Sequence, residues 1–268
     1  MLHTLTRTPQ SATGPALVFL HYYGGSIQSW STVVDRLAAD FYCLVIDLPG
    51  FGDSPPISDH QTVDDVTEAV TDAIKVQLGD RPFVLVGHSM GGKLALAVAS
   101  GTLSSPASAA LQGLVLLAPS PPVPEPIPDK DRQAMLDQPS LPPDEQQKAA
   151  EKTANNITNR PLSELTRQLI VTDNLRSSTE GWIAWLTTGS REDISARMVP
   201  INVPITILAG DHDNALPHSV QTDMVLPYLP QAALTIVAGA GHLLPIEEPD
   251  LVANAISTFC RQLKQQTT

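Results

Sequence analysis

Short, unbroken apolar runs alternate along the chain with longer segments in which apolar residues recur every three or four positions. An unbroken run of about four to eight apolar residues is typical of a strand covered on both faces, and the longer spacing is typical of an amphipathic helix. We therefore predict a doubly wound α/β domain with a mostly parallel sheet. The predicted strands span residues 16–20, 43–46, 83–86, 114–117, 205–208 and 234–237, and the predicted helices span 30–39, 63–78, 90–100 and 251–263.

The alternation of strands and helices breaks between residues 120 and 201. This segment opens with five prolines in residues 121–128. It continues with polar, helix-forming stretches near residues 129–137, 143–156, 161–175 and 180–187. We interpret residues 120–201 as a helical cap inserted into one core domain, which residues 1–119 and 202–268 form.

The chain is acidic, with 28 Asp and Glu against 16 Lys and Arg and a net charge of −12. A nucleic-acid-binding protein needs a basic surface, and the sequence contains no cluster of Lys or Arg, so we expect neither nucleic acid nor an anionic membrane as a partner. No apolar stretch reaches the roughly 18 residues of a membrane-spanning helix, and the first residues lack the apolar core of a signal peptide. We expect a cytoplasmic protein that is a monomer or a homodimer.

A possible nucleophile follows the third predicted strand. Residues 87–91, Gly-His-Ser-Met-Gly, match the pattern G-x-S-x-G, and a predicted helix comes directly after them. In this setting the serine occupies a sharp turn, and the glycines let the strand and the helix approach closely. The helix N-terminus adds partial positive charge where a substrate oxygen becomes negative. We interpret Ser89 as a catalytic nucleophile.

A serine nucleophile needs a base, and the base needs a carboxylate partner. His242 lies in a glycine-rich loop directly after the last predicted strand, so we expect it to be the base. The loop after the preceding strand contains Asp211 and Asp213, and either carboxylate is suited to pair with His242. Serine, aspartate and histidine then follow one another in the chain order typical of hydrolases whose serine lies on such a turn.

Together these motifs resemble the α/β-hydrolase superfamily, in particular its small esterase and cofactor-free haloperoxidase-like branch. The resemblance covers residues 15–119 and 202–262. Family members usually have G-x-x-D followed by proline in the acid loop, here Gly210, Asp213 and Pro217, which implies that Asp213 is the acid and leaves Asp211 as the alternative. Residues 47–54 resemble the family turn D-x-P-G-x-G-x-S, which we interpret as structural.

The resemblance also implies an oxyanion hole of two backbone N–H groups. One belongs to Met90, the residue after the nucleophile. The other belongs to Tyr23, because family members commonly have His-Gly-x after the first long strand and the residue after the glycine donates. Tyr22 stands where the family has glycine, so this position requires a backbone conformation that a bulky side chain tolerates.

Two tryptophans in the predicted cap are spaced so that they share one helix face, Trp182 and Trp185. They either pack the cap against the core or wall a substrate pocket over Ser89, and we keep both interpretations. Met135 permits the same two readings. Tyr22 is a further candidate for contact with substrate.

The remaining polar residues near these motifs are expected to be structural. We expect His88 to pack or to hydrogen-bond to the scaffold, and Lys93 to be solvated or ion-paired. His212 and His218 flank the acid loop, but their spacing matches no standard set of metal ligands. We therefore expect no metal and no other cofactor.

The sequence thus predicts a serine hydrolase that acts on a small acyl substrate. A carboxylic ester, a lactone or a thioester would pass through an acyl-enzyme on Ser89. The same residues also suit a perhydrolase or a carbon–carbon bond hydrolase. A ligand-binding protein that reuses the fold without catalysis is the remaining alternative.

Overall fold

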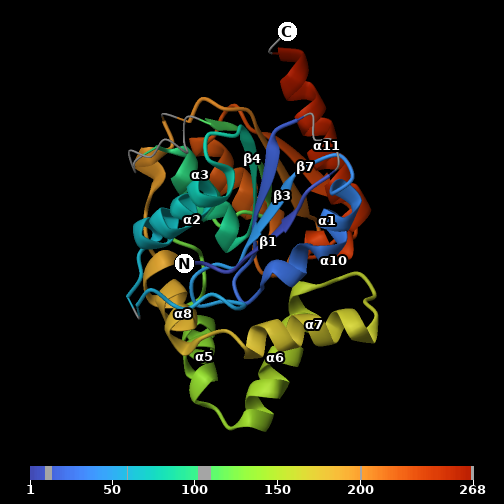
Figure 1. Ribbon diagram of the computed structural model, residues 1–268. Helices are drawn as coiled ribbons and strands as arrows, with labels where there is room; N and C mark the ends of the chain where they lie inside the picture. Colours follow the sequence, from blue (N-terminus) through green and yellow to red (C-terminus); the bar gives the residue numbers. More distant parts are fainter. Residues whose placement is uncertain (10–13, 59, 102–109, 200, 267–268) are drawn as a thin grey trace.

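A single mixed sheet forms the centre of the computed structural model, which describes residues 1–9, 14–58, 60–101, 110–199 and 201–266 (Figure 1). Within these residues the strand order is β1-β3-β2-β4-β5-β6-β7. β1 pairs with β3 in the antiparallel direction, and all other neighbours are parallel. The predicted fold class is therefore confirmed. The strands are β1 (Thr4–Arg7), β2 (Ala16–Leu20), β3 (Cys43–Ile46), β4 (Phe83–His88), β5 (Leu111–Leu117), β6 (Ile205–Gly210) and β7 (Ala233–Val237).

Helices cover both faces of the sheet, and the alternating side chains of each strand contribute to two separate cores. In β2, Leu17 and Phe19 belong to the core under helices α1 (Ser31–Leu37) and α11 (Pro249–Gln266). Val18 and Leu20 belong to the opposite core, under α2 (Val63–Leu78) and α3 (Met90–Ala99). Burial on both faces explains why the central strands appear in the sequence as unbroken apolar runs.

The cap leaves the sheet after β5 and returns at β6, and its helices gather beyond one end of the sheet, at the bottom of Figure 1. It contacts the core closely at the 47–54 turn, where the Ser178 N–H donates to the Gly50 carbonyl at 2.8 Å. Within the described residues no helix has both the length and the apolarity that crossing a membrane requires. The cap helices are α5 (Asp129–Asp137), α6 (Pro143–Ile157), α7 (Glu164–Leu175) and α8 (Thr179–Ala184).

The remaining helical segments are short. α8 continues as a π-helical turn at Trp185–Gly189, so the helix predicted over 180–187 changes its winding halfway. Two short α-helices follow in the core, α9 (His218–Val220) and α10 (Leu244–Glu247). Further 3-10 or π turns cover Ile27–Trp30, Gln138–Ser140, Ser195–Arg197, Gln221–Val225 and Leu226–Tyr228.

The edge strand β1 was not predicted, because its sequence Thr-Leu-Thr-Arg has no apolar run and its residues are half-buried or exposed. Edge strands bury less side-chain surface, so their sequences carry less hydrophobic signal. Predicted strands also ended too early: β4 extends to His88 and β6 to Gly210. In both, glycine or histidine continues the strand beyond its apolar residues.

Candidate functional site

Ser89 lies at the junction of β4 and α3 in a strained backbone conformation, with φ 54° and ψ −118°. The glycines of the motif explain how this turn fits. A Cβ at Gly87 would lie 2.4 Å from the Gly91 carbonyl oxygen, and a Cβ at Gly91 would lie 2.5 Å from the Leu20 carbonyl oxygen. Side chains at either position would collide with backbone that cannot easily move. The turn therefore holds Ser89 at the carboxyl end of the sheet, where ligands of open α/β sheets usually bind.

His242 and Asp213 form a buried pair on the loops after β7 and β6. Nδ1 of His242 lies 2.7 Å from Oδ2 of Asp213. The other carboxylate oxygen, Oδ1, accepts the N–H groups of Ala215 and Leu216, each at 2.8 Å. With both oxygens used in this way the carboxylate has a fixed orientation, so Nδ1–H of His242 is the donor and Nε2 is left as an acceptor.

The charge of Asp213 also governs the proton affinity of His242. Burial by itself would lower the pKa of His242, but the Asp213 carboxylate and its hydrogen bond outweigh burial. Glu125 and Glu247 add smaller effects in the same direction, so the pKa lies above the usual 6.5. An imidazole with a raised pKa accepts a proton readily.

Of the two aspartates that the sequence left open, only Asp213 reaches His242. Asp211 instead accepts the Gly239 N–H at 2.6 Å and lies 2.7 Å from His212 Nδ1. The Asp211 carboxylate therefore caps the turn at Gly239 and pairs with the exposed His212.

His88 supports the His242 loop from behind. Its Nε2 donates to the carbonyl of His242 at 2.8 Å, as the expected hydrogen bond to the scaffold requires. Its ring also packs beside Tyr22, with centroids 5.3 Å apart. Burial lowers the pKa of His88 well below its ordinary value, so it stays a neutral donor.

The loop from His21 to Gly25 places Tyr22 and Tyr23 on the cavity that Ser89 also lines. Gly24 takes the positive φ of 80°, and the Gly25 N–H closes the turn on the Tyr22 carbonyl at 3.0 Å. Tyr22 therefore has no positive φ, so its bulky side chain fits at the position where family members have glycine. His21 fixes the loop, because its Nδ1 donates to the Tyr22 carbonyl and its Nε2 accepts the Leu48 N–H.

Within the described part of the chain, the N–H groups of Tyr23 and Met90 have no acceptor, and neither do those of their neighbours Tyr22, Gly24 and Gly91. Met90 is the first residue of α3, and the first N–H groups of a helix lack intrahelical partners. Tyr23 follows in the loop after β2. The N–H groups of Tyr23 and Met90 thus remain candidates for binding a ligand oxygen.

A cavity of about 440 Å³ lies between the cap and the carboxyl end of the sheet. Ser89 and His242 both line it, and so do Tyr22, Tyr23 and the two cap tryptophans. Trp182 stacks on Tyr23 with ring centroids 4.4 Å apart, and its Nε1 donates to the Met135 carbonyl at 2.8 Å. The tryptophans thus pack the cap onto the core and also form a wall of the cavity.

Two outcomes differ from what the sequence suggested. Lys93 is fully buried, and its Nζ donates to the carbonyl of Glu192 at 2.6 Å, so the expectation of a solvated or ion-paired side chain was wrong. Its burial lowers its pKa to about 8. Glu125, in the proline-rich segment, lines the cavity together with Ser89, and no sequence pattern distinguishes it from an ordinary loop residue.

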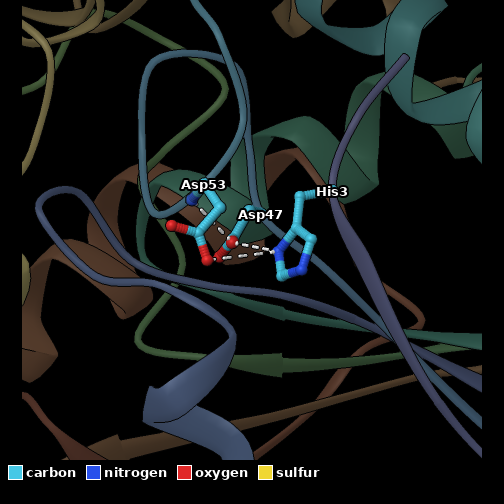
Figure 2. A group of neighbouring side chains, drawn as sticks. All are labelled: His3, Asp47 and Asp53. Atoms are coloured by element: carbon cyan, nitrogen blue, oxygen red, sulfur yellow. Dashed lines mark hydrogen bonds and ion pairs between the residues drawn. The ribbon is translucent and has the colours of Figure 1, made fainter.

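The described residues contain one group with the geometry of metal ligands, formed by His3, Asp47 and Asp53 (Figure 2). Hydrogen bonds account for this group. Asp47 Oδ1 accepts the Ile27 N–H at 2.7 Å, and Oδ2 accepts the Asp53 N–H at 2.9 Å and lies 2.7 Å from His3 Nδ1. The buried Asp47 carboxylate thus ties the first strand to the 47–54 turn, which has the structural role expected of it.

A protein of Bacillus subtilis (strain 168) with the provisional name 2-succinyl-6-hydroxy-2,4-cyclohexadiene-1-carboxylate synthase is 30% identical over 257 residues, which cover 91% of this chain and 89% of that protein. Among solved structures, a bromoperoxidase from Bacillus anthracis matches with a TM-score of 0.84 and 18% identity, covering 97% of this chain and 95% of the other.

An esterase from Exiguobacterium antarcticum matches with a TM-score of 0.83 and 17% identity, again over 97% of this chain and 95% of the other. At such low identity these two structures establish the fold alone. The model of the alpha/beta hydrolase family matches residues 17–255, which include both the core and the cap. The chain belongs to the alpha/beta hydrolase family.

Proposed function

We propose that the protein is a serine hydrolase that cleaves carboxylic esters through an acyl-enzyme on Ser89. The observation that carries the proposal is the pairing of His242 with Asp213 at 2.7 Å, at the wall of a cavity that Ser89 also lines. Asp213 contacts Nδ1 of His242, so Nε2 stays free to accept a proton, as a general base must. The strained turn at Ser89 supports the same assignment, because backbone strain persists where the surrounding structure enforces it.

In the proposed reaction Ser89 Oγ attacks the ester carbonyl carbon while His242 Nε2 takes the hydroxyl proton. The N–H groups of Met90 and Tyr23 stabilise the tetrahedral oxyanion. The C–O bond to the alcohol then breaks, and the alcohol leaves with the proton from His242. A water molecule, deprotonated by His242, attacks the acyl-enzyme. As the bond between the acyl carbon and Ser89 Oγ breaks, His242 returns the proton to Oγ, which releases the carboxylic acid and free Ser89.

A fluorophosphonate probe tests the proposal directly, because it forms a covalent bond with an activated serine. We expect intact-mass analysis to show one adduct on the wild-type protein and none on Ser89→Ala, with hydrolysis of 4-nitrophenyl esters lost in parallel. A wild-type protein that takes up no probe and hydrolyses no aryl ester, lactone or thioester would instead favour a ligand-binding protein. Peracid formation from the same acyl-enzyme with hydrogen peroxide would identify a perhydrolase.

The relative from Bacillus subtilis supports a second candidate, the synthase reaction in its name, because the similarity covers 91% of this chain. The product in that name carries a carboxylate, so its site must accept an acidic molecule. The charged lining of the present cavity, within the described residues, consists of Glu125, Asp131 and Lys152 besides His242. Because the lining carries two carboxylates and only one lysine, it favours a neutral ester over an acidic substrate. Formation of the named product by the purified protein would reverse this preference.

A further inference from the structure

Glu125 is a carboxylate in the cavity that the proposed reaction does not use. It belongs to the segment after β5, and it lines the same cavity as Ser89 and His242. Its Oε1 is buried and accepts no hydrogen bond from any described residue. A buried acceptor without a donor is unfavourable by roughly 1–3 kcal/mol, so each such atom in a native structure needs an explanation.

The Ser120 hydroxyl interacts with the Glu125 carboxyl, but it leaves Oε1 without a donor. Arg132 and Lys93 are near enough for their charges to act on it. The Arg132 guanidinium, however, donates to the Leu186 carbonyl and to Ser190 Oγ, and the Lys93 ammonium donates to backbone carbonyls. None of these bonds reaches Oε1 of Glu125, although the charges of Arg132 and Lys93 moderate the cost of a carboxylate in this half-buried position.

Glu125 also lies within electrostatic range of both sides of the proposed reaction centre. Burial raises the pKa of Tyr23, in the loop of the proposed oxyanion hole, and the charge of Glu125 adds to this effect. The same charge adds to the effect of Asp213 in raising the pKa of His242 against burial. Burial in turn raises the pKa of Glu125 itself, opposed by the Ser120 hydroxyl and the nearby cations. A molecule bound at Ser89 therefore occupies the same cavity that Glu125 lines.

We propose that Glu125 is a specificity-determining residue that accepts a hydrogen bond from an N–H or O–H group of the substrate. The proposal rests on the proposed ester hydrolysis and names the substrate class more closely: esters with a hydroxyl or amino group near the scissile carbonyl. A site built to pair with a polar substrate group discriminates strongly against analogues without it, because the buried protein group is then left unpaired.

The test compares two 4-nitrophenyl esters of equal chain length, butanoate and 3-hydroxybutanoate, with wild-type protein, Glu125→Gln and Glu125→Met. We expect the wild type to prefer the hydroxylated ester in kcat/KM by about tenfold or more, as one hydrogen bond to a buried acceptor allows. In Glu125→Met the preference should disappear while butanoate hydrolysis persists. Glu125→Gln, which retains an acceptor, should keep part of it.

Asp131→Asn is the matched control, because Asp131 is an exposed carboxylate on the same cavity. It should leave the ratio of the two esters unchanged. If the apparent melting temperature of Glu125→Met equals or exceeds that of the wild type, the Glu125 carboxylate does not serve to stabilise the fold. A preference that survives in Glu125→Met would overturn the proposal.

Binding measurements separate this proposal from the proposed hydrolysis. Calorimetry of Ser89→Ala with 3-hydroxybutanamide and butanamide requires no turnover. Tighter binding of the hydroxylated amide, abolished by adding Glu125→Met, would support the role of Glu125 even if no ester were hydrolysed. Equal binding of the two amides to Ser89→Ala would contradict it, whatever the esterase assay shows.

Discussion

The backbone N–H of His242 donates a hydrogen bond to the carbonyl of Ile157, 2.8 Å away. Ile157 is the last residue of α6, so the loop of the proposed base is joined directly to the cap. Glu247 reinforces the junction, because its Oε2 accepts the N–H groups of Asn159 in the cap at 2.8 Å and of Gly241 in the loop at 3.1 Å. Movement of this part of the cap and the position of His242 are therefore coupled.

Glu247→Gln tests this coupling. The amide nitrogen of glutamine cannot accept the N–H groups that now converge on the carboxylate, and hydrogen bonds to charged groups contribute about 1.5–3 kcal/mol each. We expect the free energy of unfolding to fall by about 2 kcal/mol in urea titrations. We also expect kcat for an aryl ester to fall more than KM changes, because the base is displaced and the cavity wall is not.

Glu248→Gln is the control for Glu247→Gln. Glu248 pairs with Arg160 at the surface, where such pairs contribute only about 0–1 kcal/mol. Equal losses in both variants would show that Glu247 has no special connection with His242.

The assignment of the acid predicts different results for neighbouring aspartates. Asp213→Asn should lower kcat by about 10⁴-fold, because an amide no longer stabilises the charged imidazole or selects its tautomer. Asp211→Asn removes a capping carboxylate at the surface and should change kcat/KM by no more than about twofold. Steady-state kinetics of the two variants with one aryl ester shows whether Asp213 or Asp211 is the acid. A large loss in Asp211→Asn alone would reverse the assignment.

The pH profile follows from the environment of His242. A general base must be neutral, and the pKa of His242 lies above 6.5. We therefore expect kcat/KM to rise with pH through a midpoint above 6.5 and then to level off. Asp213→Asn should move this midpoint below that of the wild type, because burial then acts on the imidazole without the opposing charge. A midpoint that stays in place would show that another group titrates.

The motif glycines give a prediction about folding. A Cβ at Gly91 would lie 2.5 Å from the backbone oxygen of Leu20, so Gly91→Ala should destabilise the protein by about 3 kcal/mol and reduce its activity. At Gly14 the nearest atom would lie 3.5 Å from a new Cβ, and Gly14→Ala should be neutral. Thermal melts compare the two. Unchanged stability in Gly91→Ala would mean that the turn can relax.

How far the sequence predicts each feature depends on how local its cause is. The Ser89 turn needs only a strand, two glycines and a helix, and all of these are adjacent in the chain. The choice between Asp211 and Asp213 depends on which loop residue faces His242, and family resemblance pointed to the residue that the structure pairs with it. The predicted fold class follows from apolar runs in the same local way.

Features that depend on contacts between distant segments of the chain have no local sequence pattern that predicts them. Glu125 is the single polar residue in the proline-rich segment 121–128, and its place on the cavity appears only when the cap folds over the sheet. Glu247 looks like a helix residue, but it binds a segment 88 positions earlier in the chain. Lys93 looked solvated because charged residues usually are, whereas the packed cap buries it and backbone carbonyls accept its protons.

Trp182 can be tested for its part in substrate selection apart from its part in packing. Its ring stacks on Tyr23, and its N–H donates to the Met135 carbonyl. Trp182→Ala should lower the unfolding free energy by about 3–5 kcal/mol and widen the cavity beside Ser89.

We expect the preference of Trp182→Ala to shift toward 4-nitrophenyl esters of longer acyl chains, because the space of a buried indole becomes open to the acyl group. Trp182→Phe, which keeps an aromatic ring but leaves the Met135 carbonyl unpaired, should lose stability with little change in chain-length preference. The comparison of the two variants across acetate, butanoate, octanoate and dodecanoate esters separates the two roles. If Trp182→Ala were destabilised but kept the wild-type preference, the tryptophan would serve packing alone.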